Sequence, residues 1–378
     1  MPPSDDPWHY ARDELAQRYF DQFDSRLTHA AIIFGPRRTG KTEFLLKDLG
    51  PLAQANGWKV AYASLWQARL SPLGVVLHAL ANANRRGSLT DRAAALAQAT
   101  RPKVKLGAGA PGGSAKAEVE LDLSDLRGPP SQDALLHLDD LIERFAPASR
   151  RALLLIDEAQ ELAANEANQP FVAALRTSLD KRKDRLTALF TGSSQEGLRR
   201  MFSKRDAPFF HFGAHSDWPP FDDGFVDHMV ATFAKIVRAK LDKSECAKAF
   251  RALDRNPFFF RKMLEILAFD PHRDVAAALA IVRERAAEDL RYPDVWRGLS
   301  PLQRAVAFRL AQAPDKPVAR QSLAQIGRGL DLGAPSRTQA LAAIRFLLRA
   351  EIVSRTHERG GYVFDDPEFA RWILAQAR

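Results

Sequence analysis

Residues 30–42 read AAIIFGPRRTGKT, an apolar run followed directly by an arginine-rich loop between two glycines. The run from Ala30 to Phe34 predicts a short strand that is buried on both faces, because no polar residue interrupts it. The helix-forming stretch TEFLLKDL follows the loop. The sequence therefore predicts a buried strand, a tight loop and a helix in succession.

The loop fits the phosphate-loop pattern G-x-x-x-x-G-K-[ST]. Glycine lets the backbone pass close to phosphate groups, so that successive N–H groups and the helix N-terminus surround the anion. Lys41 is expected to reach the β- and γ-phosphates of a nucleotide, and the hydroxyl of Thr42 to ligate Mg²⁺. The expected nucleotide-binding residues are Gly35, Pro36, Arg37, Arg38, Thr39, Gly40, Lys41, Thr42 and Glu43. Whether Arg37 and Arg38 meet phosphate or a neighbouring acidic surface stays open.

A second motif, LLLIDEAQ at residues 153–160, places two carboxylates at the end of another apolar strand. Asp157 is expected to hold the magnesium ion through water, and Glu158 to polarise the attacking water. One carboxylate must stay ionised beside the metal while the other accepts a proton, so the pair favours hydrolysis over nucleotide storage. A small-molecule kinase would also need an acceptor pocket, of which the sequence has no sign.

A third motif, FTGSS at residues 190–194, brings small hydroxyls to the end of a further strand. Ser193 is favoured over Ser194 as the group that contacts the γ-phosphate or the attacking water. The alternative is a plain turn. With Lys41 and Glu158, Ser193 completes the predicted catalytic set.

The order of the predicted elements indicates an α/β fold with a mostly parallel sheet and helices on both faces. Strands are predicted at residues 30–34, 58–62, 152–156 and 186–191, and helices near residues 10–23, 73–83, 133–145 and 171–179. Residues 101–131 read as an inserted hairpin with a basic and an acidic arm. The predicted α/β domain spans residues 1–221.

Residues 222–290 read as an all-helical second domain, and residues 291–378 as a third domain. In the third, helices are predicted near 301–312, 319–326 and 336–350, followed by a hairpin at 352–364 and a terminal helix from about Glu368. Three helices followed by a hairpin are typical of a winged helix-turn-helix.

Charge is concentrated at the C-terminal end of the chain. The chain has 378 residues, 55 Lys and Arg against 46 Asp and Glu, and a net charge of +9. From Arg291 onward there are 14 basic and 8 acidic residues. Such a segment attracts nucleic acid through its phosphates, although a solvated basic face is the plainer interpretation. The DNA-contact candidates of the third domain are Arg337, Thr338, Arg345, Arg349, Arg355 and Arg359.

The composition, 46% apolar and 27% charged, is that of a folded globular protein. No window is long and apolar enough to span a membrane, and the start MPPSDDPWHY does not resemble a secretion signal. The single cysteine, Cys246, fits a reducing compartment. We therefore expect a cytoplasmic protein without a membrane partner.

In this order, GPRRTGKT, LLLIDEAQ, FTGSS, the helical segment containing NPFFFR and the C-terminal domain resemble the AAA+ and STAND-type P-loop ATPases. The resemblance is to the archaeal-type branch, which is similar to origin-recognition proteins, and covers nearly the whole chain. It implies an ATPase core, a helical lid over the nucleotide, ATP and Mg²⁺ as cofactors, and self-association through the nucleotide site.

Carried over by position, Lys41 and Thr42 match the Walker A motif, Asp157 and Glu158 Walker B, and Ser193 the first sensor. Arg261 matches a second sensor or is an ordinary surface arginine. Asn256-Pro257 resembles the lid's Gly-x-Pro step, with Asn in place of Gly. The family's Pro-Leu-Tyr-Gly-Arg stretch is replaced by PFFHF at 208–212, so an arginine finger in trans would have to come from Arg199, Arg200 or Arg205.

Two functions from different classes follow from this pattern. The first is an ATP-hydrolysing switch that couples nucleotide state to domain arrangement and acts on double-stranded DNA or a DNA-bound complex. The second is a signalling or defence scaffold that uses ATP as a conformational latch and binds a protein partner through the winged helix.

Overall fold

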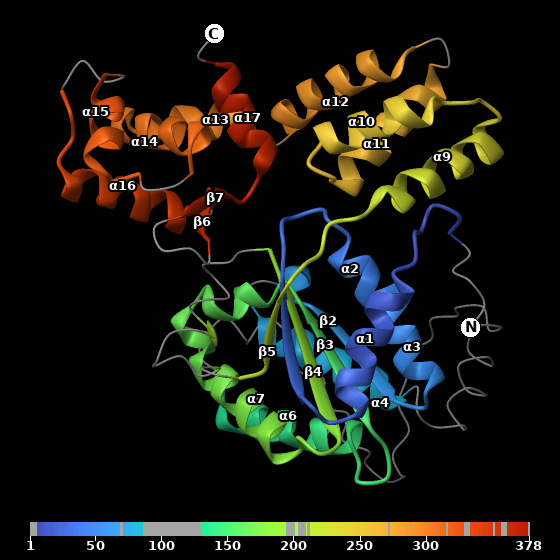
Figure 1. The fold of residues 1–378 in the computed structure, drawn as a ribbon. Helices are drawn as coiled ribbons and strands as arrows, with labels where there is room; N and C mark the ends of the chain where they lie inside the picture. Colours follow the sequence, from blue (N-terminus) through green and yellow to red (C-terminus); the bar gives the residue numbers. More distant parts are fainter. Residues whose placement is uncertain are drawn as a thin grey trace, which may run out of the picture.

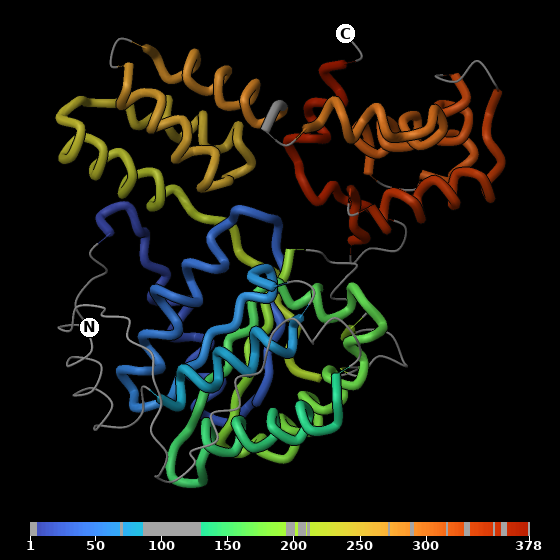
Figure 2. Tube along the Cα trace, turned by 180° about the vertical axis from the view of Figure 1, so that it is seen from behind, coloured from blue at the N-terminus to red at the C-terminus, as the bar shows by residue number. Residues whose placement is uncertain are grey.

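The computed structural model describes residues 6–68, 71–85, 130–193, 201–202, 209, 212–270, 273–289, 291–314, 317–328, 333–350, 352–356 and 361–376. Figure 1 shows one sheet covered by helices, with the helices α9–α12 above it and the elements α13–α17 beside them. The view from behind in Figure 2 shows the same arrangement. The helices of the described ranges include none with the length and apolar character needed to span a bilayer.

Five parallel strands form the central sheet, in the order β2-β3-β4-β1-β5. The strands are β1 (Ala30–Phe34), β2 (Lys59–Ser64), β3 (Ala152–Asp157), β4 (Leu186–Gly192) and β5 (Ala214–Asp217). The prediction of an α/β fold with a mostly parallel sheet is confirmed. The four predicted strands are present, with ends that differ by one or two residues.

The edge strand β5 was not predicted from the sequence. All four of its residues are exposed, so it lacks the apolar pattern that marks the other strands. It begins after Gly213, which has a φ of 81° and lies so close to β1 that a Cβ atom would come within 2.7 Å of the Ala30 carbonyl oxygen. Only glycine meets both conditions, so Gly213 allows β5 to pair with β1.

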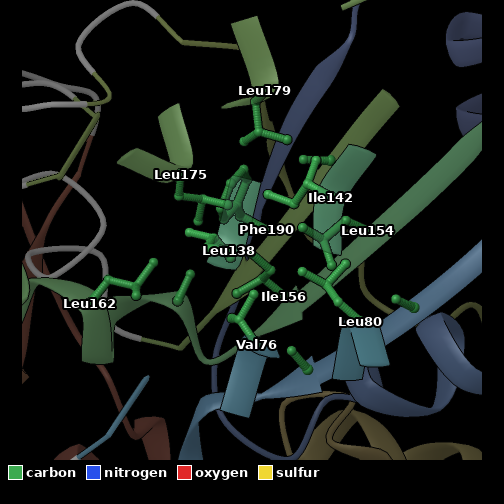
Figure 3. Packing of buried hydrophobic residues seen from close by; sticks show 14 of the residues in the cluster. Val76, Leu80, Leu138, Ile142, Leu154, Ile156, Leu162, Leu175, Leu179 and Phe190 are labelled. Carbon is green, nitrogen blue, oxygen red and sulfur yellow. The ribbon is translucent and has the colours of Figure 1, made fainter. Parts of the chain in front are cut away.

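Both faces of the sheet are covered, and alternate residues of each strand point to opposite faces. The elements of this part are α1 (Asp13–Asp24), α2 (Lys41–Glu43), the π-helical turn η1 (Phe44–Leu49), α3 (Gly50–Ala55), η2 (Leu65–Ala68), α4 (Pro72–Arg85), α6 (Gln132–Phe145), η4 (Ala159–Ala163), η5 (Glu166–Asn168) and α7 (Gln169–Lys181). On one face Ile156 and Phe190 pack against α4, α6 and α7 (Figure 3). On the other, Leu155 and Leu189 pack against α1, η1 and α3.

Helix α1 begins at Asp13, later than the sequence predicts. The periodicity from Tyr10 to Phe23 indicates one helix, but residues 6–12 take another path, which we call the N-terminal strap. The strap contacts residues far away in the sequence, including Asp48, whose carboxylate accepts a bond from the Arg12 backbone N–H at 3.4 Å. These long-range contacts override the local helical pattern. The predicted hairpin of residues 101–131 lies almost entirely outside the described residues.

The four helices above the sheet share their own hydrophobic cluster. They are α9 (Asp223–Val237), α10 (Lys243–Ala252), α11 (Pro257–Phe269) and α12 (Val275–Asp289). Helix α11 begins with Asn256, whose side chain accepts bonds from the backbone N–H groups of Phe258 and Phe259. An Asn cap followed by Pro at the first helical position is a strong helix start, which accounts for the Asn256-Pro257 pair locally.

The C-terminal elements form a further hydrophobic cluster. They are α13 (Tyr292–Gly298), α14 (Pro301–Gln312), α15 (Arg320–Arg328), α16 (Arg337–Arg349), β6 (Val353–Arg355), β7 (Tyr362–Phe364) and α17 (Pro367–Ala375). Strands β6 and β7 pair antiparallel, so the three predicted helices, the hairpin and the terminal helix are present, whereas α13 was not predicted. Helix α17 contacts the helices above the sheet through Arg371, which pairs with Asp254 and donates to the Ala252 carbonyl oxygen.

Replacing Phe190 by Ala tests how the segment after β4 is anchored. The Phe190 ring is fully buried, with ring centroids 5.4 Å from Phe202 and 5.3 Å from Phe209. Its loss leaves a cavity, so we expect Phe190→Ala to lower the free energy of unfolding by about 3–5 kcal/mol. Chemical denaturation measures this, with Leu27→Ala at an exposed site as a control expected to stay within about 0.5 kcal/mol of wild type. A Phe190→Ala loss below about 1 kcal/mol would contradict the packing described.

Candidate active site

A cavity of about 550 Å³ lies where the carboxyl end of β1 meets the helices above the sheet. The N-terminal strap, residues 38–44 and the helices α9 and α11 line it, together with Asp48, Glu158 and Phe221. Its lining includes Arg38, Thr39, Gly40, Lys41, Thr42 and Glu43 of the predicted phosphate loop. The predicted loop therefore lines this cavity.

The loop ends in a left-handed glycine. Gly40 has a φ of 91° and directly precedes helix α2, which begins at Lys41. The Lys41 ammonium is buried and donates to the carbonyl oxygens of Gly35 at 2.7 Å and Pro36 at 2.6 Å. Burial lowers the pKa of Lys41 to about 8, even though Glu158 and Asp157 favour its charged form. An anion in the loop would favour the charged form and raise this pKa towards its ordinary value.

The carboxylate of Asp157 is buried at the end of β3 and accepts three hydroxyl hydrogen bonds. Thr42 donates to Oδ2 at 2.6 Å, Tyr62 donates to Oδ2 at 3.1 Å, and Thr191 donates to Oδ1. Burial, and the charge of Asp157, raise the pKa of Tyr62, so its hydroxyl keeps the proton that it donates. Hydroxyl and carboxylate oxygens are the ligands that Mg²⁺ prefers, so Thr42 and Asp157 form a suitable donor pair.

Glu158 has a φ of 57°, in the left-handed region that non-glycine residues seldom adopt. Its Oε2 accepts a bond from Ser193 Oγ at 3.0 Å and from Gln160 Nε2 at 2.5 Å. Gln160 is buried, and its Oε1 has no hydrogen-bond partner among the described residues. Strained backbone and an unmatched buried acceptor next to a carboxylate are typical of a functional site.

The structure brings Lys41, Thr42, Asp157, Glu158 and Ser193 together at the carboxyl ends of β1, β3 and β4. Sequence reasoning missed Thr191, Tyr62 and Gln160. Thr191 belongs to the same FTGSS motif as Ser193, and its full burial follows from the apolar run before it. Gln160 lies within LLLIDEAQ, but nothing in the sequence indicates the direction of its side chain.

The N-terminal strap was also missed, although it lines one wall of the cavity. His9 Nε2 donates to Asp48 at 2.6 Å and His9 Nδ1 donates to Glu43 at 3.3 Å. Burial opposes the charged form, but the bonds to Asp48 and Glu43 outweigh it and raise the pKa of His9 to about 9. The bond from His9 in turn lowers the pKa of Glu43 to about 2. His9 therefore fastens the strap to the helix that follows the loop.

The strap also contacts the segment that leads from β5 into α9. The Arg12 guanidinium lies 4.5 Å from the Trp218 ring centroid and 4.6 Å from that of Phe221. It donates to the Pro219 carbonyl oxygen at 2.9 Å. Tyr10 donates to Asp222, the cap of α9, at 3.2 Å. The strap thus joins the loop helix to the start of the helices above the sheet.

Helix α11 faces the loop from the opposite side of the cavity. The Arg38 guanidinium lies 4.5 Å from the Phe258 ring centroid, and Arg38 has a φ of 63°. The predicted second sensor, Arg261, lines the cavity and lies 5.6 Å from the Trp8 ring centroid of the strap. Arg37 points elsewhere: its Nε donates to Ser193 Oγ at 3.2 Å.

Several predicted residues lie away from the cavity or outside the described part of the chain. Arg337, Thr338, Arg345 and Arg349 are exposed on α16, and Arg355 is exposed on β6. Ile344 and Leu348 of α16 are buried, whereas Leu341 is only half-buried. Ser194, Arg199, Arg200, Arg205 and Arg359 lie outside the described residues.

No protein-family model matches the chain, and no curated protein sequence matches it significantly. Solved structures do match. The chain is similar to the Walker-type ATPase PABY2304 of Pyrococcus abyssi, with a TM-score of 0.64, 16% identity, and coverage of 96% of this chain and 95% of that one. It is also similar to the ORC2 protein of Aeropyrum pernix in its ADPNP–ADP complexes, with a TM-score of 0.53, 15% identity, and coverage of 97% and 93%.

The chain has the AAA+ type of P-loop ATPase fold. Both similarities extend over the α/β part, the helices above it and the C-terminal elements, because they cover nearly the whole of each chain. The resemblance predicted from the motifs is thereby confirmed at the level of the fold. We call the helices α9–α12 the lid below, after the helical lid that the sequence resemblance implies.

Removing the carboxylate of Asp48 tests the fastening of the strap. In Asp48→Asn we expect the pKa of His9 to fall from about 9 towards its ordinary value of 6.5, because the neutral amide no longer favours the imidazolium. NMR titration of the His9 ring measures this. The raised pKa means that His9 stabilises the strap fully below pH 6.5 and loses this effect as the pH rises through 9.

Glu43 acts in the opposite pH range. Because the pKa of Glu43 is lowered, Glu43 stabilises the strap above pH 4.5 and loses this effect as the pH falls towards 2. Glu161→Gln, which leaves both His9 contacts in place, serves as the matched control. An unchanged His9 pKa in Asp48→Asn would contradict the proposed fastening.

Proposed function

We propose that this protein binds and hydrolyses ATP, and that it acts as a molecular switch on double-stranded DNA or a DNA-bound complex. The observation that carries the proposal is the hydrogen bond from the Thr42 hydroxyl to Asp157 Oδ2 at 2.6 Å. Glu158 is adjacent to Asp157 and accepts a hydrogen bond from Ser193. These are the groups that a hydrolytic phosphate site needs: a metal ligand pair, a base and a hydroxyl.

ATP binds with its phosphates in the loop from Gly35 to Thr42. Lys41 pairs with the β- and γ-phosphates, and backbone N–H groups at the start of α2 supply further donors. Thr42 and Asp157 hold Mg²⁺, which neutralises phosphate charge when bound. The Thr42 hydroxyl donates a hydrogen bond to the Asp157 carboxylate, so the two proposed ligands lie side by side, which supports this assignment.

The base and ribose occupy the part of the cavity between the strap and the lid. Trp8, Tyr10, Phe221 and Phe225 line it, and aromatic rings of this kind stack on a purine. Arg261 of α11 faces the same cavity and contributes lid contact to the phosphates. No guanine-reading Asn-Lys-x-Asp motif is evident in the sequence, which favours ATP over GTP.

Hydrolysis depends on Glu158. Its carboxylate accepts a proton from water as the water oxygen attacks the γ-phosphorus. Ser193 orients that carboxylate through its bond to Oε2 and acts as the first sensor of the γ-phosphate. Gln160 donates to the same oxygen and leaves the other carboxylate oxygen for the water.

Domain coupling runs through the short lid segment at residues 252–259. At one end, Phe258 stacks against Arg38 of the phosphate loop. At the other, Asp254 pairs with Arg371 of α17. A shift of the phosphate loop against α11 therefore acts on the same segment that α17 holds. The proposed division into a core (1–221), a lid (222–290) and a winged helix domain (291–378) is supported by their separate hydrophobic clusters.

The DNA surface is formed by the third helix and hairpin of the proposed winged helix. Arg345 and Arg349 lie one helical turn apart on the exposed face of α16, with Arg337 and Thr338 near its start. Arg355 extends the same basic character onto β6. A basic exposed helix of this kind fits the major groove and its phosphates.

Glu158→Gln tests the hydrolytic role. The amide cannot accept a proton from water but keeps the size of the side chain, so we expect ATP affinity within about threefold of wild type and turnover reduced by a factor of about 100 or more. Radioactive phosphate release measures turnover, and equilibrium binding of a fluorescent ATP analogue measures affinity. Lys41→Ala, which should lose binding, reports contaminating activity. Turnover of Glu158→Gln at the wild-type rate would refute the role of Glu158.

Arg345→Ala combined with Arg349→Ala tests the DNA surface. Loss of two phosphate contacts should weaken duplex binding about tenfold or more at low salt. It should also reduce the slope of log affinity against log salt concentration by about two. Fluorescence anisotropy with a labelled duplex measures both. Lys248→Ala combined with Arg285→Ala removes the same charge from exposed lid positions and should bind as wild type does. Absence of wild-type binding at low salt would refute the DNA role and point to a protein partner.

A further inference from the structure

The N-terminal strap runs along α9 in the opposite direction and contacts it at three levels. Arg12 lies beside the segment before the helix, where its guanidinium donates to the Pro219 carbonyl oxygen at 2.9 Å. Tyr10 lies at the start of the helix, where its hydroxyl donates to Asp222 at 3.2 Å. Pro7 contacts the helix about two to three turns further on. The strap and the first part of α9 therefore lie side by side.

The contacts between the strap and the lid are stronger at Arg12 than at Pro7. The Arg12 guanidinium is charged and, besides its hydrogen bonds, lies 4.5 Å from the Trp218 ring centroid. At Pro7 a single carbonyl oxygen accepts one bond from His228 Nε2 at 3.1 Å and one from Thr232 Oγ1 at 3.3 Å. Bonds from a charged donor are stronger than those from an uncharged hydroxyl. The strap is thus joined firmly to the segment before α9 and lightly to the helix itself.

The strap is fastened to the core through charged side chains. His9 bonds to Asp48 and Glu43, and the side chains of His9 and Asp48 are only 8% and 2% exposed. Lys47 pairs with Asp6 at 2.9 Å beside them. Separation of a buried charged pair leaves charge without a partner, which costs more than breaking a neutral hydrogen bond. The contact between the strap and α9 therefore breaks more readily than the contacts between the strap and the core.

The strap and α9 are two walls of one cavity. Trp8 and Tyr10 of the strap, and Phe225 and Met229 of α9, line the cavity together with the phosphate loop. Residues 218–222, which we call the hinge segment, are a short connection between β5 and α9, and hinges are usually such segments at the ends of elements. Motion of the lid about the hinge segment separates the two walls and widens the cavity.

We propose that the strap is a clasp that controls nucleotide exchange. The lid turns about the hinge segment, α9 separates from the strap at Pro7, and the strap stays on the core. This inference rests on the proposed nucleotide site between the phosphate loop, the strap and the lid. In a molecular switch, release of the bound nucleotide sets how long each state lasts. The clasp therefore determines the lifetime of the ADP-bound state.

A clasp has a kinetic signature that a direct ligand contact lacks. A closed clasp hinders entry and exit of the nucleotide alike, so weakening it speeds association and dissociation by similar factors and leaves the Kd nearly unchanged. Loss of a direct contact to the nucleotide instead speeds dissociation and raises the Kd by the same factor. The two rate constants together therefore distinguish a clasp from a binding surface.

Thr232→Val combined with His228→Phe tests the clasp. Each change removes one bond to the Pro7 carbonyl oxygen and leaves a side chain of similar shape. A hydrogen bond of this kind changes an equilibrium by about twofold to tenfold, so both rate constants for a fluorescent ADP analogue should rise about fivefold or more while the Kd stays within about twofold. Stopped-flow fluorescence measures both rate constants. Lys235→Ala, at an exposed position of the same helix, is the matched control and should exchange as wild type does.

Three results of this experiment would overturn the proposal. Rate constants of the α9 double variant within about twofold of wild type would show that the contact at Pro7 does not restrain exchange. Faster dissociation with unchanged association would make His228 and Thr232 part of a binding surface. Faster exchange in Asp48→Asn, which loosens the strap on the core, without faster exchange in the α9 double variant would show that the strap leaves the core instead.

A cross-link tests the opposite change. Pro7→Cys and Thr232→Cys, introduced together with Cys246→Ala, are then the only thiols of the chain, and oxidation joins the strap to α9. We expect the oxidised protein to exchange the ADP analogue at least about tenfold more slowly than the reduced protein, which serves as the control for the substitutions themselves. Titration of free thiols measures the extent of cross-linking. Unchanged exchange in fully cross-linked protein would overturn the proposal.

The same measurements separate failure of the clasp from failure of the nucleotide site. Wild type that does not bind the ADP analogue would refute the proposed nucleotide site itself. Wild type that binds the analogue, and exchanges it at a rate that neither the α9 double variant nor the cross-link changes, would refute the clasp alone.

Discussion

The buried carboxylate of Asp157 is the interaction on which the site depends. It joins β2 through Tyr62, β4 through Thr191 and the loop helix through Thr42. A buried charge is costly unless it is well hydrogen-bonded, and three hydroxyl donors meet that cost here. Because each donor comes from a different element, the carboxylate holds the phosphate loop in register with the sheet. The loop, the adjacent Glu158 and Ser193 then have defined positions relative to one another.

The N-terminal strap extends this fixed frame to the lid. His9 holds the strap on the loop helix, and Arg12 packs between the rings of Trp218 and Phe221 at the start of the lid. Backbone carbonyls of Pro219 and Pro220 accept bonds from the same guanidinium, so the strap is tied directly to the connecting segment. A change in lid position must therefore strain or break contacts of the strap. The strap is for this reason part of the proposed nucleotide site.

A structural feature of this chain could be predicted from the sequence where the residues that cause it lie close together in the sequence. The strand β1, its loop and the carboxylates of LLLIDEAQ were predictable, because an apolar run and a glycine pattern lie within a few residues of each other. The strand β5 was not, because it is exposed and owes its place to the close approach of Gly213 to β1. Residues 10–12 of the strap were predicted as helix because the partners of Arg12 lie 36 and 207 residues away in the sequence.

The directions of the side chains were the feature hardest to predict from the sequence. Arg38 and Glu158 both have a left-handed backbone, which costs roughly 1–3 kcal/mol at a non-glycine residue. Glycine would avoid that strain but would remove the charge. The contacts within the site explain why the strain is retained. Lys41 donates to backbone carbonyls, while Asp157 and Glu158 accept from hydroxyls and an amide.

In these contacts each charge is satisfied by a neutral partner, which offsets the cost of burial without cancelling the charge. The two signs also lie on different elements, the cations on the loop after β1 and the carboxylates at the end of β3. In the proposed function, a phosphate chain in the loop would meet cations directly, and a metal ion would meet carboxylate and hydroxyl oxygens beside it. The cations and the carboxylates are thus kept apart by hydrogen bonds to neutral groups. This arrangement suits an anionic ligand on one side and a metal ion on the other.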